Sequence, residues 1–274
     1  MESNGRAPRL ERHVAADSQI LTVGGTWRRR AAFVEAPGQT RLWRATQITV
    51  LIHDLSQTKL PELYPNTSAT FERNAKQFLH VADRIMVYSE ATRADVADLL
   101  AETGPFKPIA KFWMGSIMVA APVPGSEPRT VPFGLEMCVG RPVVLHVSSI
   151  EPRKNHRMLV EVWRRLIEAR GDSIPMLLCM ERPVMDGQLL IEEVQADQIL
   201  KRHVHFATGL NDDALDWCYR NAAFTVYPSL YEGWGLPIAE SLLYGKLCIT
   251  SNASSMREVA RELRDLLDPA DVVA

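Results

Sequence analysis

The sequence predicts an α/β fold built from two Rossmann-like αβα domains with parallel sheets. Short apolar runs alternate with segments of helical character along most of the 274 residues. Strands that alternate with helices form parallel sheets covered on both faces. Six prolines and glycines between residues 120 and 134 interrupt this alternation and disfavour helix and strand alike. We therefore expect an N-terminal domain over residues 1–119, a linker over 120–139 and a C-terminal domain over 140–274.

The first domain is expected to contain four strands. Apolar runs predict them over residues 17–24, 47–52, 84–88 and, more weakly, 109–113. One helix is expected over 67–82. A second begins after Ser89, a favourable N-cap residue, and runs to about Ala101.

The second domain repeats the alternation more clearly. Strands are predicted over 143–147, 176–180, 204–206, 224–227 and 247–250. Asn155 can cap a helix whose apolar residues between 159 and 167 share one face. Further helices are expected over 188–200, 212–221 and 237–244, the last ended by Gly245. Ligands of such sheets bind in the loops at the carboxyl ends of strands, so these loops are where chemistry is expected.

The composition argues against several classes of protein. The 31 basic and 33 acidic residues give a net charge of −2, whereas a nucleic-acid-binding protein needs a basic excess. The four cysteines lie far apart without metal-ligand spacing, so neither a zinc site nor a disulfide framework is predicted. The polar N-terminus lacks an apolar signal core, and no apolar stretch approaches the roughly 20 residues that span a bilayer. A cytoplasmic globular protein is expected.

The loop over residues 228–240 combines an anion site with two carboxylates. Gly233 and Gly235 let the backbone approach a ligand, and Pro237 suits the first position of a helix. The amides of residues 235–239 would then point out of a helix N-terminus, which favours anions. Glu232 and Glu240 flank these amides, as expected for a ligand that carries both hydroxyls and phosphates. Alternatively, Glu232 is solvated and Glu240 only complements the helix dipole.

Two further loops carry candidate residues. Arg153 and Lys154 directly precede a helix and could neutralise a diphosphate without a metal; alternatively they are solvated surface cations. His53 ends a strand of the first domain, where it could hydrogen-bond a substrate with Asp54 orienting it; alternatively it is structural. A basic run at residues 28–30, with Arg41 and Arg44 nearby, is either a solvated helix face or a contact for anionic lipid heads.

With these loops in place, the sequence resembles the retaining glycosyltransferases of family four, which have the two-domain GT-B fold. Among them it is most similar to bacterial mannosyltransferase-like members of surface polysaccharide and lipopolysaccharide assembly. The resemblance rests mainly on YPSLYEGWGLPIAESLLYG at residues 227–245, including its two glutamates with seven residues between them. Four shorter segments support it: IEPRKN at 150–155, SNASSMREV at 251–259, HDLSQTKLPELYP at 53–65 and ADRIMVYSEATRAD at 82–95.

The resemblance implies a hexosyltransferase that uses a nucleoside diphosphate sugar, with GDP-mannose the expected donor and a glycan or lipid-linked molecule the acceptor. Arg153 and Lys154 would bind the donor diphosphate. Glu232 would contact the transferred sugar, and Glu240 would bind the ribose hydroxyls. His53 would sit at the reacting centre. No metal or other cofactor is implied, and the enzyme would work in the cytoplasm, with peripheral contact to the inner face of the membrane.

The resemblance also implies that the backbone of Gly233, Trp234, Gly235 and Leu236 holds sugar and phosphate. Ser148 occupies a donor-side position where many relatives have an arginine. Compared with those relatives, the chain is expected to lack part of the N-terminal domain and the C-terminal helices. Two alternatives stay open at this point: a non-catalytic remnant that binds nucleotide sugars, and a sugar-nucleotide epimerase on the same fold.

Overall fold

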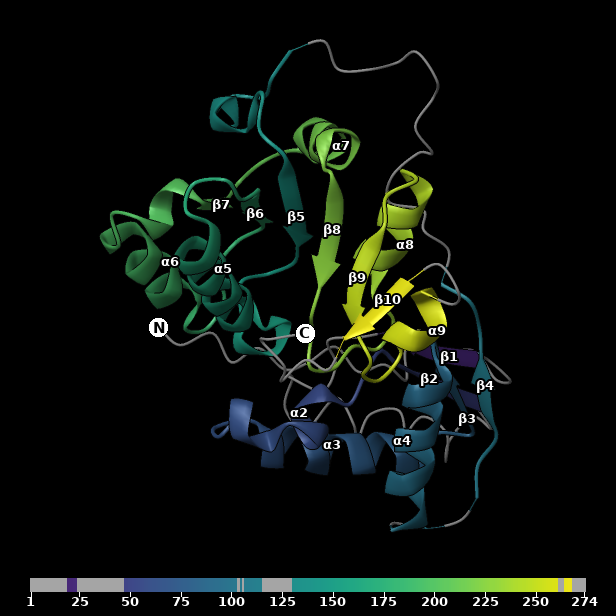
Figure 1. Cartoon of the computed structure of the whole chain (residues 1–274). Coiled ribbons are helices and arrows are strands. Elements are labelled where there is room, and N and C mark those ends of the chain that lie inside the picture. The colour runs from purple at the N-terminus through teal and green to yellow at the C-terminus, as the bar shows by residue number, and fades with distance from the viewer. Residues whose placement is uncertain are drawn as a thin grey trace, which may run out of the picture. The chain divides into compact units, whose positions relative to one another are not determined.

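Two parallel sheets, each flanked by helices, organise the computed structural model (Figure 1). The structure describes residues 19–23, 47–102, 104, 106–114, 130–260 and 264–267. The chain divides into two compact units, Met1–Met114 and Gly115–Ala274. The predicted α/β class with parallel sheets is therefore confirmed.

The first unit contains a parallel sheet in the order β1-β2-β3-β4. Its strands are β1 (Gln19–Val23), β2 (Gln47–Ile52), β3 (Arg84–Val87) and β4 (Ile109–Lys111). Helices α3 (Ser68–Val81) and α4 (Glu90–Ala101) follow β2 and β3, and the short helices α2 (Ser56–Lys59) and η3 (Pro61–Leu63) precede α3. Ser89 caps α4 as predicted, because its Oγ accepts a 3.0 Å hydrogen bond from the amide of Thr92.

The second unit contains a parallel sheet in the order β10-β9-β8-β5-β6-β7, seen from right to left in Figure 1. Its strands are β5 (Val143–Val147), β6 (Met176–Met180), β7 (Val204–Ala207), β8 (Phe224–Tyr227), β9 (Cys248–Ser251) and β10 (Arg264–Leu267). Its helices are α5 (His156–Arg170), α6 (Gly187–Ala196), α7 (Asp212–Asn221), α8 (Leu236–Leu243) and α9 (Met256–Ala260), with single turns η4 (Glu136–Cys138), η5 (Pro152–Lys154) and η6 (Leu200–Arg202).

The order of the second sheet decides where a ligand can bind. Strand β5 pairs with β6 on one side and with β8 on the other, so the direction of winding reverses between β5 and β8. Doubly wound sheets bind ligands at this point, outside the carboxyl ends of the strands. The loops that follow β5 and β8 therefore lie next to each other, and both contain residues singled out in the sequence.

The core of the second unit fills both faces of its sheet. Val144 packs into one buried cluster, whereas its neighbours Val143 and Leu145 pack into another, as the alternation along a strand requires. All four cysteines are buried and free.

Two expectations about the second unit need correction, and two elements were missed. Leu135 and Cys138, expected in the linker, are buried in its core, so residues 130–139 belong to this unit. The helix expected over 188–200 ends at Ala196, because Asp197 Oδ1 accepts from the amides of Ile199 and Leu200 and starts a separate turn. Helix α9 and strand β10 were not predicted.

Candidate functional site

The loops after β5 and β8 meet through a buried cation and a buried carboxylate. Lys154 Nζ lies 2.6 Å from Glu232 Oε1. Tyr227, the last residue of β8, completes a triangle: its hydroxyl accepts from Lys154 Nζ at 3.1 Å and donates to Glu232 Oε1 at 3.1 Å. All three residues are buried. The interpretations of Lys154 as a surface cation and of Glu232 as a solvated carboxylate are therefore wrong.

Arg153 adds a second cation to the same carboxylate. Its Nη1 lies 2.9 Å from Glu232 Oε2 and donates to the carbonyl of Tyr231 at 2.8 Å. Its Nη2 lies 3.0 Å from Glu151 Oε1. Burial alone would raise the pKa of Glu232, but Lys154 and Arg153 outweigh it and hold that pKa at about 2. The cluster of Glu151, Arg153, Lys154 and Glu232 thus carries two positive and two negative charges.

Backbone contacts lock the two loops together. The amide of Leu230 donates to the carbonyl of Arg153 at 2.9 Å. Asn155 occupies the N-cap position of α5 with a left-handed backbone, φ 61°, and makes no side-chain cap. Its Nδ2 instead donates to the carbonyl of Pro228 at 3.2 Å. The predicted N-cap position of Asn155 is therefore confirmed, but its side chain binds one loop to the other instead of capping the helix.

The glycine turn after β8 is held by two serines that precede α9. Ser254 Oγ accepts from the amide of Glu232 at 2.8 Å. Ser255 Oγ lies 2.8 Å from the carbonyl of Glu232 and 2.9 Å from that of Trp234. These serines fall in the segment 251–259 that supported the resemblance, but no role was predicted for them.

The predicted cluster of free amides is smaller than expected. Gly235 adopts φ 104°, a conformation that L side chains rarely adopt, and it directly precedes α8. Because α8 begins at Leu236, Pro237 is its second residue, not its first. Pro237 has no amide hydrogen, and the amide of Ile238 donates to the carbonyl of Gly235 at 3.1 Å. These two residues therefore offer no amide to an anion.

Glu240 is a buried carboxylate held by a tyrosine. Its Oε2 accepts from the hydroxyl of Tyr219, on α7, at 2.7 Å. Burial raises the pKa of Glu240, and the hydrogen bond from Tyr219 acts against this rise. Glu240 is the fifth residue of α8, beyond the first turn, so the dipole of that helix does not explain its position. Tyr219 was not among the predicted site residues.

Ser148 is bound to a neutral histidine. Ser148 Oγ lies 2.9 Å from His146 Nε2, and His146 Nδ1 lies 2.9 Å from the carbonyl of Val226. A carbonyl can only accept, so we assign the ring proton to Nδ1, and Nε2 accepts from the serine hydroxyl. Burial lowers the pKa of His146 to about 4. Ser148 consequently presents lone pairs, rather than a proton, to any further partner.

His53 lies at the end of β2, in the first unit. Its ring is 5.4 Å from that of Tyr88, and its pKa is lowered by burial, with Asp54 opposing the shift. Asp54 does not orient it: Asp54 Oδ1 accepts from the amide and hydroxyl of Ser56 at 2.9 and 2.7 Å. Because His53 and Glu232 belong to different units, the prediction that His53 sits at the reacting centre stays a prediction.

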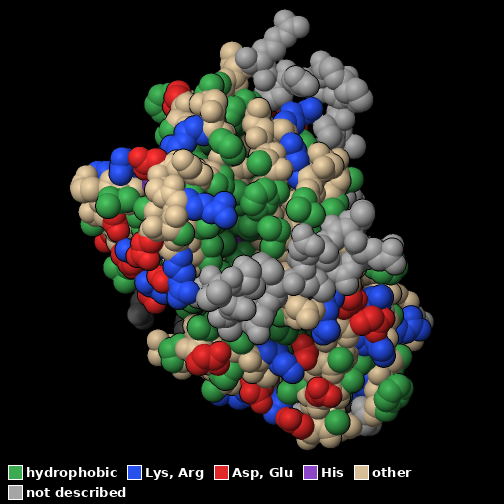
Figure 2. Space-filling view, viewed as in Figure 1, with side chains coloured by type: hydrophobic (Ala, Val, Ile, Leu, Met, Phe, Trp, Pro, Cys, Tyr) green, Lys and Arg blue, Asp and Glu red, His purple; other side chains and the backbone are tan. Residues whose placement is uncertain are grey.

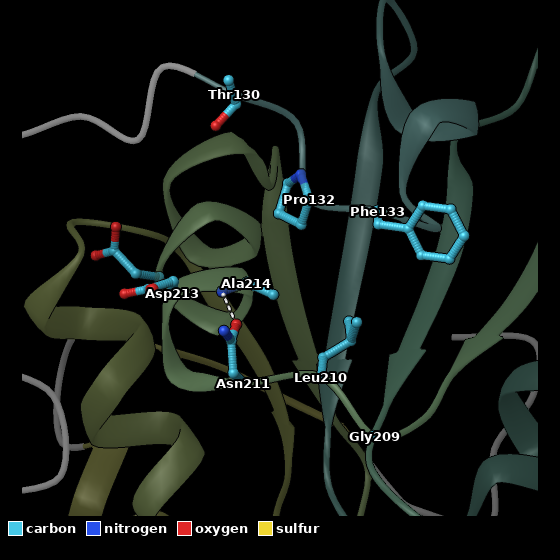
Figure 3. Close-up of a pocket in the computed structure, with 9 residues that line it drawn as sticks. Thr130, Pro132, Phe133, Gly209, Leu210, Asn211, Asp213 and Ala214 are labelled. Carbon is cyan, nitrogen blue, oxygen red and sulfur yellow. Dashed lines mark hydrogen bonds between the residues drawn. The ribbon is translucent and has the colours of Figure 1, made fainter.

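A pocket of about 660 Å³ lies beside the N-terminal end of α7 (Figure 3). It is lined by Thr130, Pro132, Phe133, Gly209, Leu210, Asn211, Asp213, Ala214 and Asp216. None of the predicted site residues lines it. Asp216 links it to the region of Glu240, because Asp216 Oδ1 accepts from the hydroxyl of Tyr244 at 2.6 Å and the Tyr244 ring stacks on Tyr219.

The surface of the described residues mixes both signs of charge. Figure 2 shows acidic and basic side chains interspersed on the face in view. Exposed cations and carboxylates also form pairs, such as Arg157 with Glu193 at 3.0 Å. The basic run at residues 28–30, with Arg41 and Arg44, lies outside the described residues. Within the described part of the chain, no helix is long and apolar enough to cross a membrane. The same part holds no group of three or more His, Cys, Asp or Glu side chains arranged for a metal ion.

Comparison with known proteins adds a family and several relatives. The family model described as "Glycosyl transferases group 1" matches residues 133–269. The O-antigen chain mannosyltransferase B of Escherichia coli is 26% identical over 235 residues, which cover 84% of this chain and 60% of that protein. The serotype-specific mannosyltransferase WbdA of Escherichia coli is 26% identical over 80% of this chain, but only 26% of WbdA is covered. The chain thus spans part of the length of these relatives.

Solved structures support the fold. The structure of Anabaena HepE in complex with UDP and glucose matches 93% of this chain and 65% of that chain, with a TM-score of 0.67 and 15% identity. A sucrose-phosphate synthase from Thermosynechococcus elongatus matches 90% of this chain and 67% of that chain, with a TM-score of 0.63 and 18% identity. At these identities the likeness shows the α/β fold with parallel sheets.

Proposed function

Because the chain belongs to the group 1 glycosyltransferases, we propose that it transfers a hexosyl group from a nucleoside diphosphate sugar to a glycan or lipid-linked acceptor. The observation that carries the proposal is the contact of Lys154 with Glu232, which joins the cationic loop after β5 to the acidic glycine turn after β8. Both loops lie at the switch point of the sheet, where a nucleotide ligand is expected.

The charges of this cluster give each residue a role. Lys154 and Arg153 are positioned to neutralise the donor diphosphate, whose negative charge grows as the bond to the sugar breaks. Glu232 sits between them and is ionised, so it can contact the sugar as positive charge develops on the ring. The diphosphate competes with Glu232 for these cations, since both are already paired with its carboxylate.

The remaining predicted residues complete the proposal. Glu240 accepts hydrogen bonds from the ribose hydroxyls, and the backbone of residues 233–236 faces sugar and phosphate. His53 of the first unit approaches the sugar at the reacting centre. We propose retention of the anomeric configuration, no metal requirement, and a cytoplasmic reaction at the inner face of the membrane.

Mannose is the proposed sugar, with GDP-mannose as the donor. The support comes from the relatives, which are named as mannosyltransferases, one of them of the O-antigen chain. The corresponding acceptor is a mannose-containing glycan, free or lipid-linked.

The test is a transfer assay with the purified chain. Labelled GDP-mannose, UDP-glucose and ADP-glucose are each incubated with mannose-terminated glycans, free and lipid-linked, with and without EDTA. We expect transfer from GDP-mannose that EDTA does not reduce, because Arg153 and Lys154 supply the positive charge. Nucleotide binding without transfer to any acceptor would instead indicate a binding protein. An altered sugar nucleotide formed without acceptor would indicate an epimerase.

Two variants test whether the donor binds at the site around Lys154. Lys154→Ala removes the buried cation and is expected to weaken donor binding by roughly 1–3 kcal/mol. Arg157→Ala removes an exposed cation three positions away, whose partner is Glu193 on α6, and is expected to leave binding unchanged. Equal donor affinity in the two variants would contradict the proposed site.

A further inference from the structure

We propose that Tyr219 is a positioning residue, whose hydroxyl fixes the carboxylate of Glu240 so that its other oxygen can accept the ribose hydroxyls of a nucleoside diphosphate. This inference rests on the proposed function, because it assumes that Glu240 contacts the donor. It adds a residue of α7, outside the segments that carry the resemblance, to the donor site.

The geometry around Glu240 carries this inference. The Tyr219 hydroxyl donates to Oε2 at 2.7 Å, and among the described residues the Glu240 carboxylate has no other hydrogen bond. Both residues are buried, with Tyr219 0% and Glu240 6% exposed. One carboxylate oxygen is therefore held by the protein, while the other has no partner within the described part of the chain. A diol donates two hydrogen bonds, which this arrangement can accept.

Tyr219 is itself rigidly placed. Its ring stacks on that of Tyr244, with centroids 5.0 Å apart and planes inclined by 11°. Within the described part of the chain, the Tyr244 hydroxyl makes no hydrogen bond to Glu240 and donates to Asp216 Oδ1 at 2.6 Å. A tyrosine in such packing offers a hydrogen bond at a fixed point and loses little entropy when a ligand binds.

The hydrogen bond also favours the form of Glu240 that binds hydroxyls. Burial raises the pKa of Glu240, and the bond from Tyr219 counteracts this. Tyr244, Tyr227 and Cys248 are titratable groups that interact electrostatically with this pair. Burial raises the pKa of each, so all three are neutral near pH 7. The charged groups beside them are Asp216, which accepts from the Tyr244 hydroxyl, and Arg220, which pairs with Asp216 and lies 5.8 Å from the centroid of the Tyr244 ring. On Glu240 itself, the hydrogen bond from Tyr219 is the interaction that lowers the pKa against the effect of burial.

The test compares Tyr219→Phe with Tyr244→Phe. Each variant keeps its ring and loses one hydroxyl bonded to a carboxylate, but only the first loses the bond to Glu240. GDP binding is measured by calorimetry between about pH 5.5 and 8. We expect Tyr219→Phe to bind GDP roughly three- to tenfold more weakly, and Tyr244→Phe to stay within about twofold of the parent. In transfer assays, Tyr219→Phe should raise the donor KM more than it lowers kcat.

The pH dependence of GDP affinity distinguishes a positioning role of Tyr219 from a general contribution of Tyr219 to stability. Without Tyr219 the pKa of Glu240 rises further, so the affinity deficit should grow as pH falls. A deficit that is constant across pH, or equal in both variants, would overturn the inference.

A third variant, Glu240→Gln, tests the assumption that Glu240 contacts the donor. Unchanged GDP affinity in Glu240→Gln would overturn the proposed role of Glu240. Weaker GDP binding in Glu240→Gln together with unchanged binding in Tyr219→Phe would overturn only the role of Tyr219. If the parent chain binds none of GDP, UDP and ADP, both proposals fall.

Discussion

Lys154 and Glu232 are 78 positions apart in the sequence and 2.6 Å apart in the structure. The parallel pairing of β5 with β8 brings them together, since each residue lies in the loop that follows one of these strands. The consequence is competition: the cations expected to bind a diphosphate already have a carboxylate partner in the protein.

This competition predicts opposite effects of one substitution on binding and on transfer. Glu232→Gln keeps the size of the side chain and removes its charge, so Lys154 and Arg153 become available to phosphate oxygens. We expect GDP to bind roughly three- to tenfold more tightly, because a competing anion has been removed. Sugar transfer should fall by about tenfold or more, because the carboxylate no longer stabilises charge on the sugar. Calorimetry and the transfer assay measure the two effects.

Glu193→Gln is the matched control for this substitution. Glu193 also pairs with two cations, Arg157 and Arg164, but on the exposed surface of α6. Neither GDP binding nor transfer should change in this variant. A folded Glu232→Gln protein that binds GDP more weakly than the parent would contradict the competition.

Glu232 also predicts a loss of stability in acid. Its pKa is about 2 in the folded chain, against an ordinary value of 4.5. A carboxyl whose folded pKa is lowered stabilises the fold above its unfolded pKa, and this contribution is lost as pH falls from about 4.5 to 2. The contribution is up to about 3 kcal/mol. Urea unfolding followed by tryptophan fluorescence should show a shallower decline over this pH range in Glu232→Gln than in the parent chain, and an equal slope would count against the ion pair.

The buried ring of His146 predicts a separate decline in the free energy of unfolding, at higher pH than the decline caused by Glu232. Burial lowers its pKa to about 4, so the folded chain keeps the ring neutral while the unfolded chain protonates it below about 6.5. Unfolding thus takes up a proton, and the free energy of unfolding should fall between pH 6.5 and 4 by about 3 kcal/mol from this residue. His156, whose pKa burial also lowers, adds to the same decline. His146→Gln should flatten this slope when the free energy of unfolding is measured in urea at a series of pH values, and an unchanged slope would contradict the neutral, buried ring.

Most of the fold could be predicted because its strands are apolar and its helices periodic. β6 is buried along its whole length and has the continuous apolar run that such strands show. β10 could not be found in this way, because its sequence, RDLL, lacks that pattern and its pairing depends on β9. Residues 130–139 were misplaced because proline and glycine disfavour regular structure, yet Leu135 still packs into the core.

The candidate site was predicted only in part, for a physical reason. The order of the strands was not predictable from local patterns, yet that order brings Arg153 and Lys154 to Glu232. Tyr219 lies in a segment without a local signal, and Ser255 lies in the segment 251–259, where no contact with the glycine turn could be predicted. The sequence therefore indicated which residues carry charge, but not that the charges cancel within the protein.

The last prediction concerns the stability of the glycine turn after β8, whose backbone supports Glu232. Gly235 adopts φ 104°, and a Cβ there would lie 3.1 Å from Cδ1 of the fully buried Ile238. Gly235→Ala should therefore cost about 2 kcal/mol of stability through backbone strain and crowding together. Gly245→Ala is the comparison, because Gly245 has φ 66° and no atom within 4 Å of its added Cβ. Gly245→Ala should cost only about 1 kcal/mol of stability.

If Gly235→Ala also weakens GDP binding while Gly245→Ala does not, the glycine turn contributes to the donor site directly. Equal losses of stability and unchanged binding in both variants would show that the turn relaxes around the added methyl group and that its backbone does not face the nucleotide.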